Sequence, residues 1–347
     1  MTPPAAMTSP ITPSDNASLQ LGLAPDVISS LGLLGNIDSV LTAVPLCLAR
    51  FITSLGSLQT LLFSPSPPLA RVWDERHAFG RLRLYQPLQP TGTALLYLHG
   101  GGFVLCGLRT HDGLCRAIAA RTGLTIASLE YRLAPEHPLP APQQDTLHAY
   151  QHLATRWRRV AVGGDSAGGN LAASLCLQLA LARAGRSVPP LPLGEEVAPL
   201  TTLAATPMPA LQLLIYPALD LASASPSHAR YARGWLLSAR LRDFFWGHYL
   251  GPEGQAREAL KRHVLVSPLR AEPAALAGLC PALVLTAEYD ILHDEGVQYV
   301  QALQASGVQA EHMEARGLYH GFATQTELKT GALALQAFCD RAAALLQ

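Results

Sequence analysis

Short apolar runs alternate with longer helical stretches along most of this chain, from about residue 82 to the C-terminus. Strands that alternate with helices favour a mostly parallel sheet with helices on both faces. The pattern therefore predicts an α/β fold, and 347 residues suffice for one large buried core. The predicted strands are residues 94–98, 124–129, 160–162, 211–216, 282–286 and 308–314, and the predicted helices are 114–120, 171–184 and 331–346.

The composition limits which partners this chain can have. Lys and Arg together number 25, as do Asp and Glu, so no basic surface favours nucleic acid. The histidines and cysteines match no zinc-binding motif, and we expect neither a metal nor a cofactor. The cysteines form no C-x-x-C pair, and we expect buried, reduced thiols in a cytoplasmic protein. They are Cys47, Cys106, Cys115, Cys176, Cys280 and Cys339.

The N-terminal segment, residues 1–65, precedes the alternating pattern. Its beginning is rich in Pro, Ser and Thr without a basic region, so no secretory signal peptide is predicted. Residues 27–63 are strongly apolar, but Asp38 and Pro45 interrupt them, so no membrane-spanning helix is expected. We predict two amphipathic helices that cover an apolar surface. The alternatives are a helical extension that only packs, and a segment that binds a membrane surface or another protein.

One serine stands between glycines at the point where a predicted strand meets a predicted helix. Gly164 to Gly168 reads G-D-S-A-G, which fits the G-x-S-x-G pattern of a nucleophile elbow with Ser166 at its tip. Flanking glycines fit such a turn because its strained backbone leaves no room for neighbouring side chains. The alternative is a glycine-rich turn that only starts a helix. For Asp165 we expect a hydrogen bond that fixes the turn, with surface exposure as the alternative.

Three consecutive glycines, residues 100–102, follow the predicted strand 94–98. Such a run lets backbone N–H groups point at a ligand with no side chain in the way, as an oxyanion hole requires. Beside a nucleophile elbow, the N–H of the residue after the nucleophile, here Ala167, completes the hole. A phosphate-binding loop is the alternative, but neither glycine cluster matches G-x-G-x-x-G or G-x-x-x-x-G-K-[ST].

A serine hydroxyl needs a base that takes its proton and a third group that orients this base. After a nucleophile elbow, the acid and then the base are expected later in the chain. Asp290 follows the predicted strand 282–286, and His320 follows the last predicted strand, so both lie where ligands bind in open α/β sheets. The alternatives are Asp294 and Glu288 for the acid, and His312 and His293 for the base.

Four sequence blocks together resemble the hormone-sensitive-lipase-like branch of the α/β-hydrolase esterases. The blocks are H-G-G-G-F at 99–103, Y-R-L-A-P-E-H-P-L-P-A at 131–141, G-D-S-A-G-G-N at 164–170, and D-I-L-H-D-E-G at 290–296 with H-G-F at 320–322. The resemblance implies the α/β-hydrolase fold, in which helices flank a mostly parallel central sheet and a helical cap covers it. It also implies esterase or lipase activity without a cofactor.

The same resemblance implies roles for single residues. Ser166 would be the nucleophile, His320 the base and Asp290 the acid that orients the base. The implied oxyanion donors are the N–H groups of Gly101, Gly102 and Ala167.

The resemblance also implies a layout of domains. A cap would combine residues 1–65 with residues 223–265, which belong to a catalytic domain of residues 66–347. Residues 223–265 carry aromatic side chains with helical spacing, which are either core residues or the wall of a pocket. The Pro-rich stretch 187–210 reads as a long surface loop.

The predicted function is that of a serine carboxylesterase that forms an acyl-enzyme intermediate. The apolar cap segments and the neutral composition favour a small uncharged ester with a short-to-medium acyl chain. A homodimer is compatible with the sequence. Two alternatives stay open. One is an amidase or arylamide deacetylase, because the same triad cleaves both bonds, and the other is a non-catalytic receptor for a small ligand.

Overall fold

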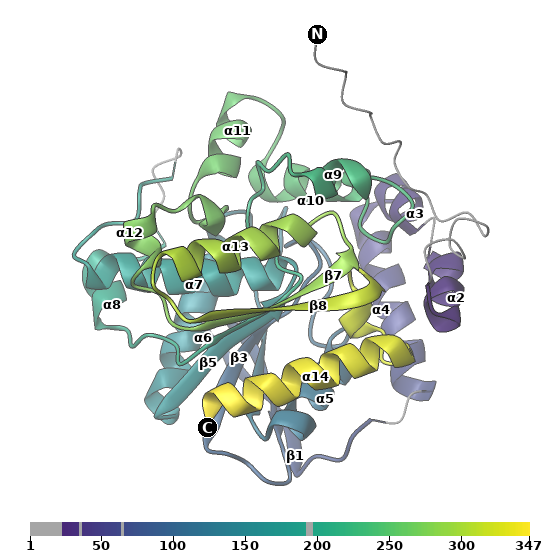
Figure 1. The fold of residues 1–347 in the computed structure, drawn as a ribbon, viewed down its shortest axis with the longest axis horizontal. Coiled ribbons are helices and arrows are strands. Elements are labelled where there is room, and N and C mark those ends of the chain that lie inside the picture. The colour runs from purple at the N-terminus through teal and green to yellow at the C-terminus, as the bar shows by residue number, and fades with distance from the viewer. Residues whose placement is uncertain (1–22, 35–36, 64–65, 192–196) are drawn as a thin grey trace.

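The computed structural model of the chain describes residues 23–34, 37–63, 66–191 and 197–347 (Figure 1). A central sheet has the strand order β1-β2-β4-β3-β5-β6-β7-β8. Neighbouring strands from β4 to β8 are parallel, which confirms the predicted sheet. The strands are β1 (Arg71–His77), β2 (Gly80–Gln86), β3 (Thr93–Leu98), β4 (Thr125–Glu130), β5 (Arg159–Asp165), β6 (Gln212–Ile215), β7 (Ala282–Tyr289) and β8 (Ala310–Tyr319).

The antiparallel hairpin of β1 and β2 at one edge of the sheet is absent from the predicted strands. Its outer strand, β1, is rich in charged residues and partly exposed, so it lacks an apolar run. The charges pair across the hairpin, since Arg83 Nε lies 2.7 Å from Asp74 Oδ1. Charged residues on an edge strand discourage pairing with a second sheet.

Helices cover both faces of the sheet (Figure 1). On one face α5 (Asp112–Thr122) packs against α14 (Lys329–Leu346). The other face carries α6 (Ala141–Arg156), α7 (Ala167–Arg183) and α13 (His293–Ala305). Because both faces are covered, central strands have continuous apolar runs, and every residue of β3 is buried.

Within the described residues 23–63, three helices precede the sheet, whereas two were expected. They are α2 (Pro25–Leu34), α3 (Ile37–Ala43) and α4 (Leu46–Phe63). Pro45 lies between α3 and α4, where its missing N–H and fixed φ interrupt a continuous helix. Contacts with the start of α14 hold α2 in place, because Thr330 N donates to Asp26 Oδ2 at 3.0 Å. None of the described helices combines the length and hydropathy needed to span a bilayer.

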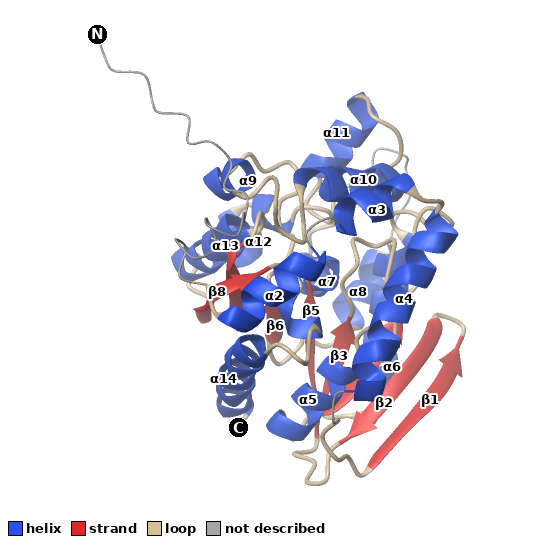
Figure 2. Ribbon diagram, turned by 90° about the vertical axis from the view of Figure 1, so that its right-hand side faces the viewer, coloured by secondary structure: helices blue, strands red, loops and turns tan. Residues whose placement is uncertain are grey.

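A layer of helices lies above the sheet (Figure 2). It contains α3 with α9 (Pro226–Arg230), α10 (Ala239–Leu250) and α11 (Gln255–Arg262). Ser238 Oγ accepts from Leu241 N at the start of α10 and donates to Asp38 Oδ2 of α3 at 2.7 Å. Helix α3 of the N-terminal segment and residues 223–265 are therefore joined in one layer.

Part of the Pro-rich stretch 187–210 is helical. Residues Leu200–Ala205 form α8, which packs against α7, so the expected loop is wrong for these residues. Residues 192–196 lie outside the described part of the chain. A further short helix, α12 (Pro273–Leu276), packs against α7 and α13.

The cysteines follow the expected burial in four of six cases. Cys47 on α4 is exposed and Cys106 is partly exposed, so the expectation is wrong for these two. Among the buried thiols, the Sγ atoms of Cys176 and Cys280 lie 3.7 Å apart, at the distance of a weak hydrogen bond, and form no disulfide.

Candidate active site

Ser166 lies at a tight turn between the end of β5 and the start of α7. Its φ and ψ are 55° and −117°, a strained conformation for a residue with a side chain. Gly164 and Gly168 make this turn possible, because a Cβ on either would overlap the carbonyl oxygen of Leu98. The turn therefore has the geometry of an elbow that presents the serine, and it does more than start a helix.

The structure brings Asp290 and His320 to the serine. His320 Nε2 lies 2.9 Å from Ser166 Oγ, and His320 Nδ1 lies 2.7 Å from Asp290 Oδ2. Asp290 follows β7 and is fully buried, and its other oxygen accepts a hydrogen bond from Leu292 N at 2.9 Å. His320 follows β8 and is 7% exposed, so the base sits between a buried carboxylate and the hydroxyl.

The four rival candidates form hydrogen bonds elsewhere, and within the described residues none of them bonds to Ser166 or His320. Their partners are Ser227 for Asp294, Gly317 for Glu288, Thr286 for His312, and Glu314 and Asp294 for His293.

The glycine loop that follows β3 lies against the elbow, since Gly100 N donates to Asp165 Oδ1 at 3.0 Å. Gly101 and Gly102 have φ values of 104° and 62°, which favour glycine. Their N–H groups have no hydrogen-bond partner among the described residues. Ala167 begins α7, and the first N–H groups of a helix have no partner within it. Free backbone donors therefore come from both segments.

Asp165 is buried, so the alternative of surface exposure is wrong. Its hydrogen bond from Gly100 N confirms the prediction that this side chain holds the turn in place. Its carboxylate accepts from Tyr97 Oη at 2.8 Å and lies 3.1 Å from His111 Nε2. Burial raises the pKa of Asp165, but the charge of His111 and these hydrogen bonds outweigh burial and lower it. Sequence analysis misses His111, because only the fold brings the residue before α5 to the elbow.

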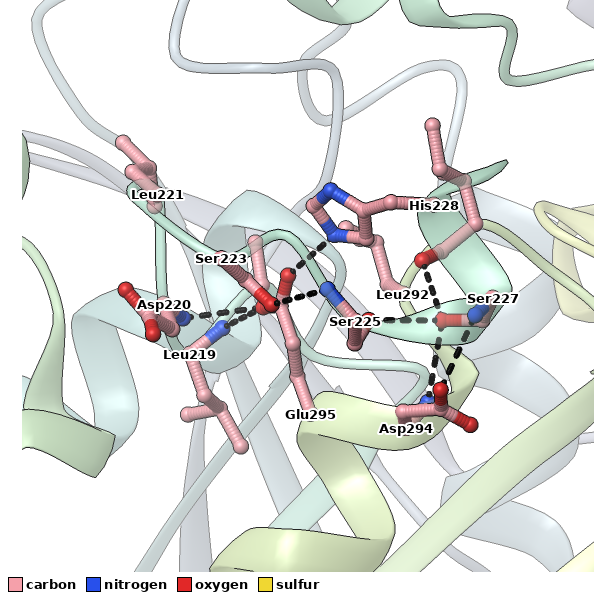
Figure 3. A network of polar contacts seen from close by, with 12 residues as sticks. Leu219, Asp220, Leu221, Ser223, Ser225, Ser227, His228, Leu292, Asp294 and Glu295 are labelled. Atoms are coloured by element: carbon pink, nitrogen blue, oxygen red, sulfur yellow. Dashed lines mark hydrogen bonds and ion pairs between the residues drawn. The ribbon is translucent and has the colours of Figure 1, made fainter. Parts of the chain in front are cut away.

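A third buried carboxylate, Glu295 on α13, holds the loop after β6 (Figure 3). Its Oε2 accepts from Leu219 N at 2.7 Å and Asp220 N at 2.8 Å, and its Oε1 lies 2.8 Å from His228 Nε2. Arg242 Nη1 lies 2.9 Å from His228 Nδ1. A guanidinium only donates, so Nδ1 accepts and the Nε2 proton points to Glu295. This chain of contacts ties α9 and α10 to α13.

The N-terminal helix α4 is fixed to the glycine loop by Arg50. Its Nε donates to Val104 O at 2.9 Å, and its Nη2 donates to Ala134 O at 2.8 Å. The same guanidinium pairs with both oxygens of Glu136, at 2.9 and 2.8 Å. Sequence analysis misses Arg50, Glu295 and His228 as site residues. Of these, only Glu295 stands in a recognised block, D-I-L-H-D-E-G.

Among the described residues, one cluster could offer three ligand atoms to a metal ion: Glu75, His77 and His152. Arg156 Nη1 already lies 2.6 Å from Glu75 Oε2 and 3.3 Å from His152 Nε2, where a metal would compete with it. Burial opposes ionisation of this carboxyl, but hydrogen bonds from Arg156 and Trp73 lower the pKa of Glu75 to about 2. Because a guanidinium satisfies the carboxylate, this donor set does not fit a metal site.

Comparison with known proteins places these features in context. The sequence profile described as the alpha/beta hydrolase fold matches residues 95–324. The carboxylic ester hydrolase LipN of Mycobacterium tuberculosis is 38% identical over an alignment of 261 positions, which covers 73% of this chain and 63% of LipN. The ethyl acetate hydrolase of Pseudomonas putida is 36% identical over an alignment of 252 positions, which covers 70% of each chain.

The fold is also similar to that of a solved ester hydrolase. The ester-hydrolase EH1AB1 from the metagenome of Lake Arreo was solved in complex with a derivative of bipyridine phosphonate. Its TM-score with this chain is 0.77 at 33% identity, over 93% of this chain and 98% of that one.

Proposed function

The chain belongs to the α/β-hydrolase fold family, in its hormone-sensitive-lipase-like branch, and from this premise we propose that it is a carboxylic ester hydrolase. One observation carries the proposal. Ser166 Oγ, His320 and Asp290 form a continuous chain of contacts at 2.9 and 2.7 Å. The relatives LipN, a carboxylic ester hydrolase, and the ethyl acetate hydrolase support the choice of an ester bond.

In the first half-reaction, Ser166 Oγ attacks the ester carbonyl carbon while His320 Nε2 takes the hydroxyl proton. The carbonyl oxygen becomes an oxyanion and accepts hydrogen bonds from the N–H groups of Gly101, Gly102 and Ala167. The ester C–O bond then breaks, and the imidazolium gives its proton to the leaving alcohol. The acyl group remains bound to the serine.

In the second half-reaction, a water molecule attacks the acyl carbonyl and gives a proton to His320. The bond to Ser166 Oγ breaks, the serine recovers its proton, and the carboxylic acid leaves. In both halves Asp290 accepts from the Nδ1–H of the base, which keeps Nε2 facing the serine and stabilises the imidazolium. Burial of Asp290 supports this role, because a dry carboxylate interacts more strongly with that positive charge.

We assign the helices above the sheet to a cap on the catalytic domain of residues 66–347. The cap combines the N-terminal helices with residues 223–265, and the bond from Ser238 to Asp38 that joins the two supports this assignment. Aromatic side chains of the cap pack beside the proposed triad, since Trp235 stacks on Tyr289, the residue before Asp290, with ring centroids 4.7 Å apart. The charged cap residues Arg50 and Arg242 are already paired with Glu136 and His228. This environment supports an uncharged ester with a short-to-medium acyl chain.

Hydrolysis of p-nitrophenyl butyrate by the wild-type protein and by Ser166→Ala tests the proposal. We expect turnover by the wild type and its loss in the variant, with unchanged circular dichroism spectra. Asp294→Asn is the matched control, because this residue lies near the site but bonds to Ser227. Equal turnover by the wild type and a folded Ser166→Ala protein would refute a serine nucleophile. If a folded wild type cleaves none of a panel of esters, the proposed activity itself is wrong.

A further inference from the structure

Phe245 on α10 lies directly on the glycine loop that follows β3. Its side chain is buried, and a Cβ added to Gly102 would overlap its ring. Gly102 is one of the proposed oxyanion donors. The ring therefore packs, from the cap side, on the loop that carries the proposed oxyanion donors.

The position of this ring is fixed by the next turn of the helix. Tyr249 stacks on Phe103, the residue after Gly102, with ring centroids 3.9 Å apart and planes within 12°. Residues four apart lie on the same face of a helix. The face of α10 that carries Phe245 and Tyr249 therefore meets two consecutive residues of the glycine loop.

A second anchor holds the start of α10. Arg242 Nη1 bonds to His228, which in turn bonds to the buried Glu295. The helix is thus tied at both ends, and Phe245 lies between the two anchors. Its ring is a fixed wall of the site in this conformation.

Another cap residue, Leu236, lies on the opposite loop of the site. A Cβ added to Gly321, the residue after His320, would lie only 2.8 Å from Leu236 Cδ2. Leu236 is only partly buried. Because His320 must protonate the leaving oxygen, the alcohol part of the ester lies on this side of the serine.

The four substituents of the tetrahedral carbon must point in different directions. The serine oxygen, the oxyanion and the leaving oxygen have defined directions, and the acyl chain takes the remaining one. We infer that Phe245 limits the length of the acyl chain, whereas Leu236 limits the size of the alcohol. The substrates are then esters of short acyl chains. This inference rests on the proposed esterase function and adds the residue that selects the acyl group.

Two substrate series separate these roles. In the acyl series, p-nitrophenyl esters from acetate to laurate share one leaving group. In the alcohol series, butyrate esters from methyl to hexyl share one acyl group and are followed by acid release in a pH-stat. Values of kcat/KM are measured for the wild type, Phe245→Ala, Phe245→Leu and Leu236→Ala. Phe244→Ala is the control, because this partly buried neighbour lies tilted against His248 in the same helix and meets the Phe245 ring only edge to face, with centroids 5.8 Å apart.

We expect the wild type to prefer short acyl chains. Phe245→Ala should raise the ratio of kcat/KM for decanoate over butyrate by about tenfold or more, the lower bound for pocket contacts of this kind. Its alcohol profile should stay that of the wild type. Leu236→Ala should show the reverse pattern, and Phe244→Ala should leave both profiles unchanged.

An unchanged acyl profile in a folded Phe245→Ala protein would overturn the inference. An equal rise of the decanoate-to-butyrate ratio in Phe244→Ala would also overturn it, because loosening of α10 would then be enough to admit longer acyl chains. If Phe245→Ala does not fold, Phe245→Leu replaces it, because leucine keeps a smaller apolar side chain at this position. The ratio of kcat/KM for decanoate over butyrate then tests the inference in this variant. Absence of ester hydrolysis by the wild type would instead refute the proposed function, so the two failures are distinguishable.

Discussion

Asp165 and His111 form a buried pair directly behind the elbow, with 3.1 Å between Oδ1 and Nε2. The side chains are 5% and 2% exposed, so water screens their interaction very little. The same carboxylate accepts from Gly100 N, the first N–H of the glycine loop. This pair therefore joins the residue before Ser166 to the loop that carries the proposed oxyanion donors.

Asp165→Asn should lower the free energy of unfolding by about 1.5–3 kcal/mol at pH 7, the range for hydrogen bonds to a charged group. The folded pKa of Asp165 is lowered from its usual value, which is about 3.9 in an unfolded chain. Ionised Asp165 thus stabilises the fold above about pH 4, and this stabilisation is lost as the pH falls through the folded pKa. Urea unfolding of both proteins between pH 3 and pH 7 measures the difference.

The control for this measurement is Asp340→Asn. Asp340 pairs with Arg121 on the surface, and both side chains are about half exposed. We expect no measurable change in stability at pH 7. A stability difference between the wild type and Asp165→Asn that stays constant down to pH 3 would contradict the assigned charge.

Asp290→Asn should leave the fold intact and lower kcat for p-nitrophenyl butyrate by about 10⁴-fold. This is the typical effect of replacing the orienting carboxylate, because an amide can favour the wrong tautomer of the base. Asp294→Asn, whose carboxylate bonds to Ser227 N, should change kcat by less than tenfold. Steady-state kinetics of both variants decide between the two carboxylates, and the larger loss in Asp294→Asn would reverse the assignment.

The sequence predicts the parallel part of the sheet because buried strands between two helical layers must be apolar on both faces. It also predicts Ser166, Asp290 and His320, since each stands at the end of such a strand and in a recognised block. It cannot predict β1, whose charged residues are satisfied by partners on other segments, such as Arg83 of β2 for Asp74 and Arg156 of α6 for Glu75. Residues such as His111 and His228, which support the site without belonging to the triad, are placed by contacts between segments far apart in the chain. No local pattern marks them.

His228→Ala should destabilise the protein by about 1.5–3 kcal/mol, the range for hydrogen bonds to a charged group, because it removes the hydrogen bond that His228 donates to the buried carboxylate of Glu295. Burial raises the pKa of Glu295, so this carboxylate depends on its hydrogen bonds to remain ionised. Urea unfolding at pH 7 measures the effect. His148→Ala is the control, since His148 is exposed on α6. Equal urea midpoints of unfolding for His228→Ala and His148→Ala would show that the contacts of His228 with Arg242 and Glu295 add no stability.

Gly102→Ala tests the contact between the glycine loop and α10 through stability alone. The new Cβ would overlap the ring of Phe245, which costs about 1–3 kcal/mol as overpacking, and a φ of 62° adds about 1–2 kcal/mol of strain. Gly92→Ala is the matched control, because Gly92 has a φ of 82° with no atom within 4 Å of an added Cβ. It should show the strain alone. The double variant Gly102→Ala/Phe245→Ala should lose less stability than the sum of the single changes, because the overlap is gone. Strict additivity in urea unfolding would show that the ring and the loop do not touch in solution.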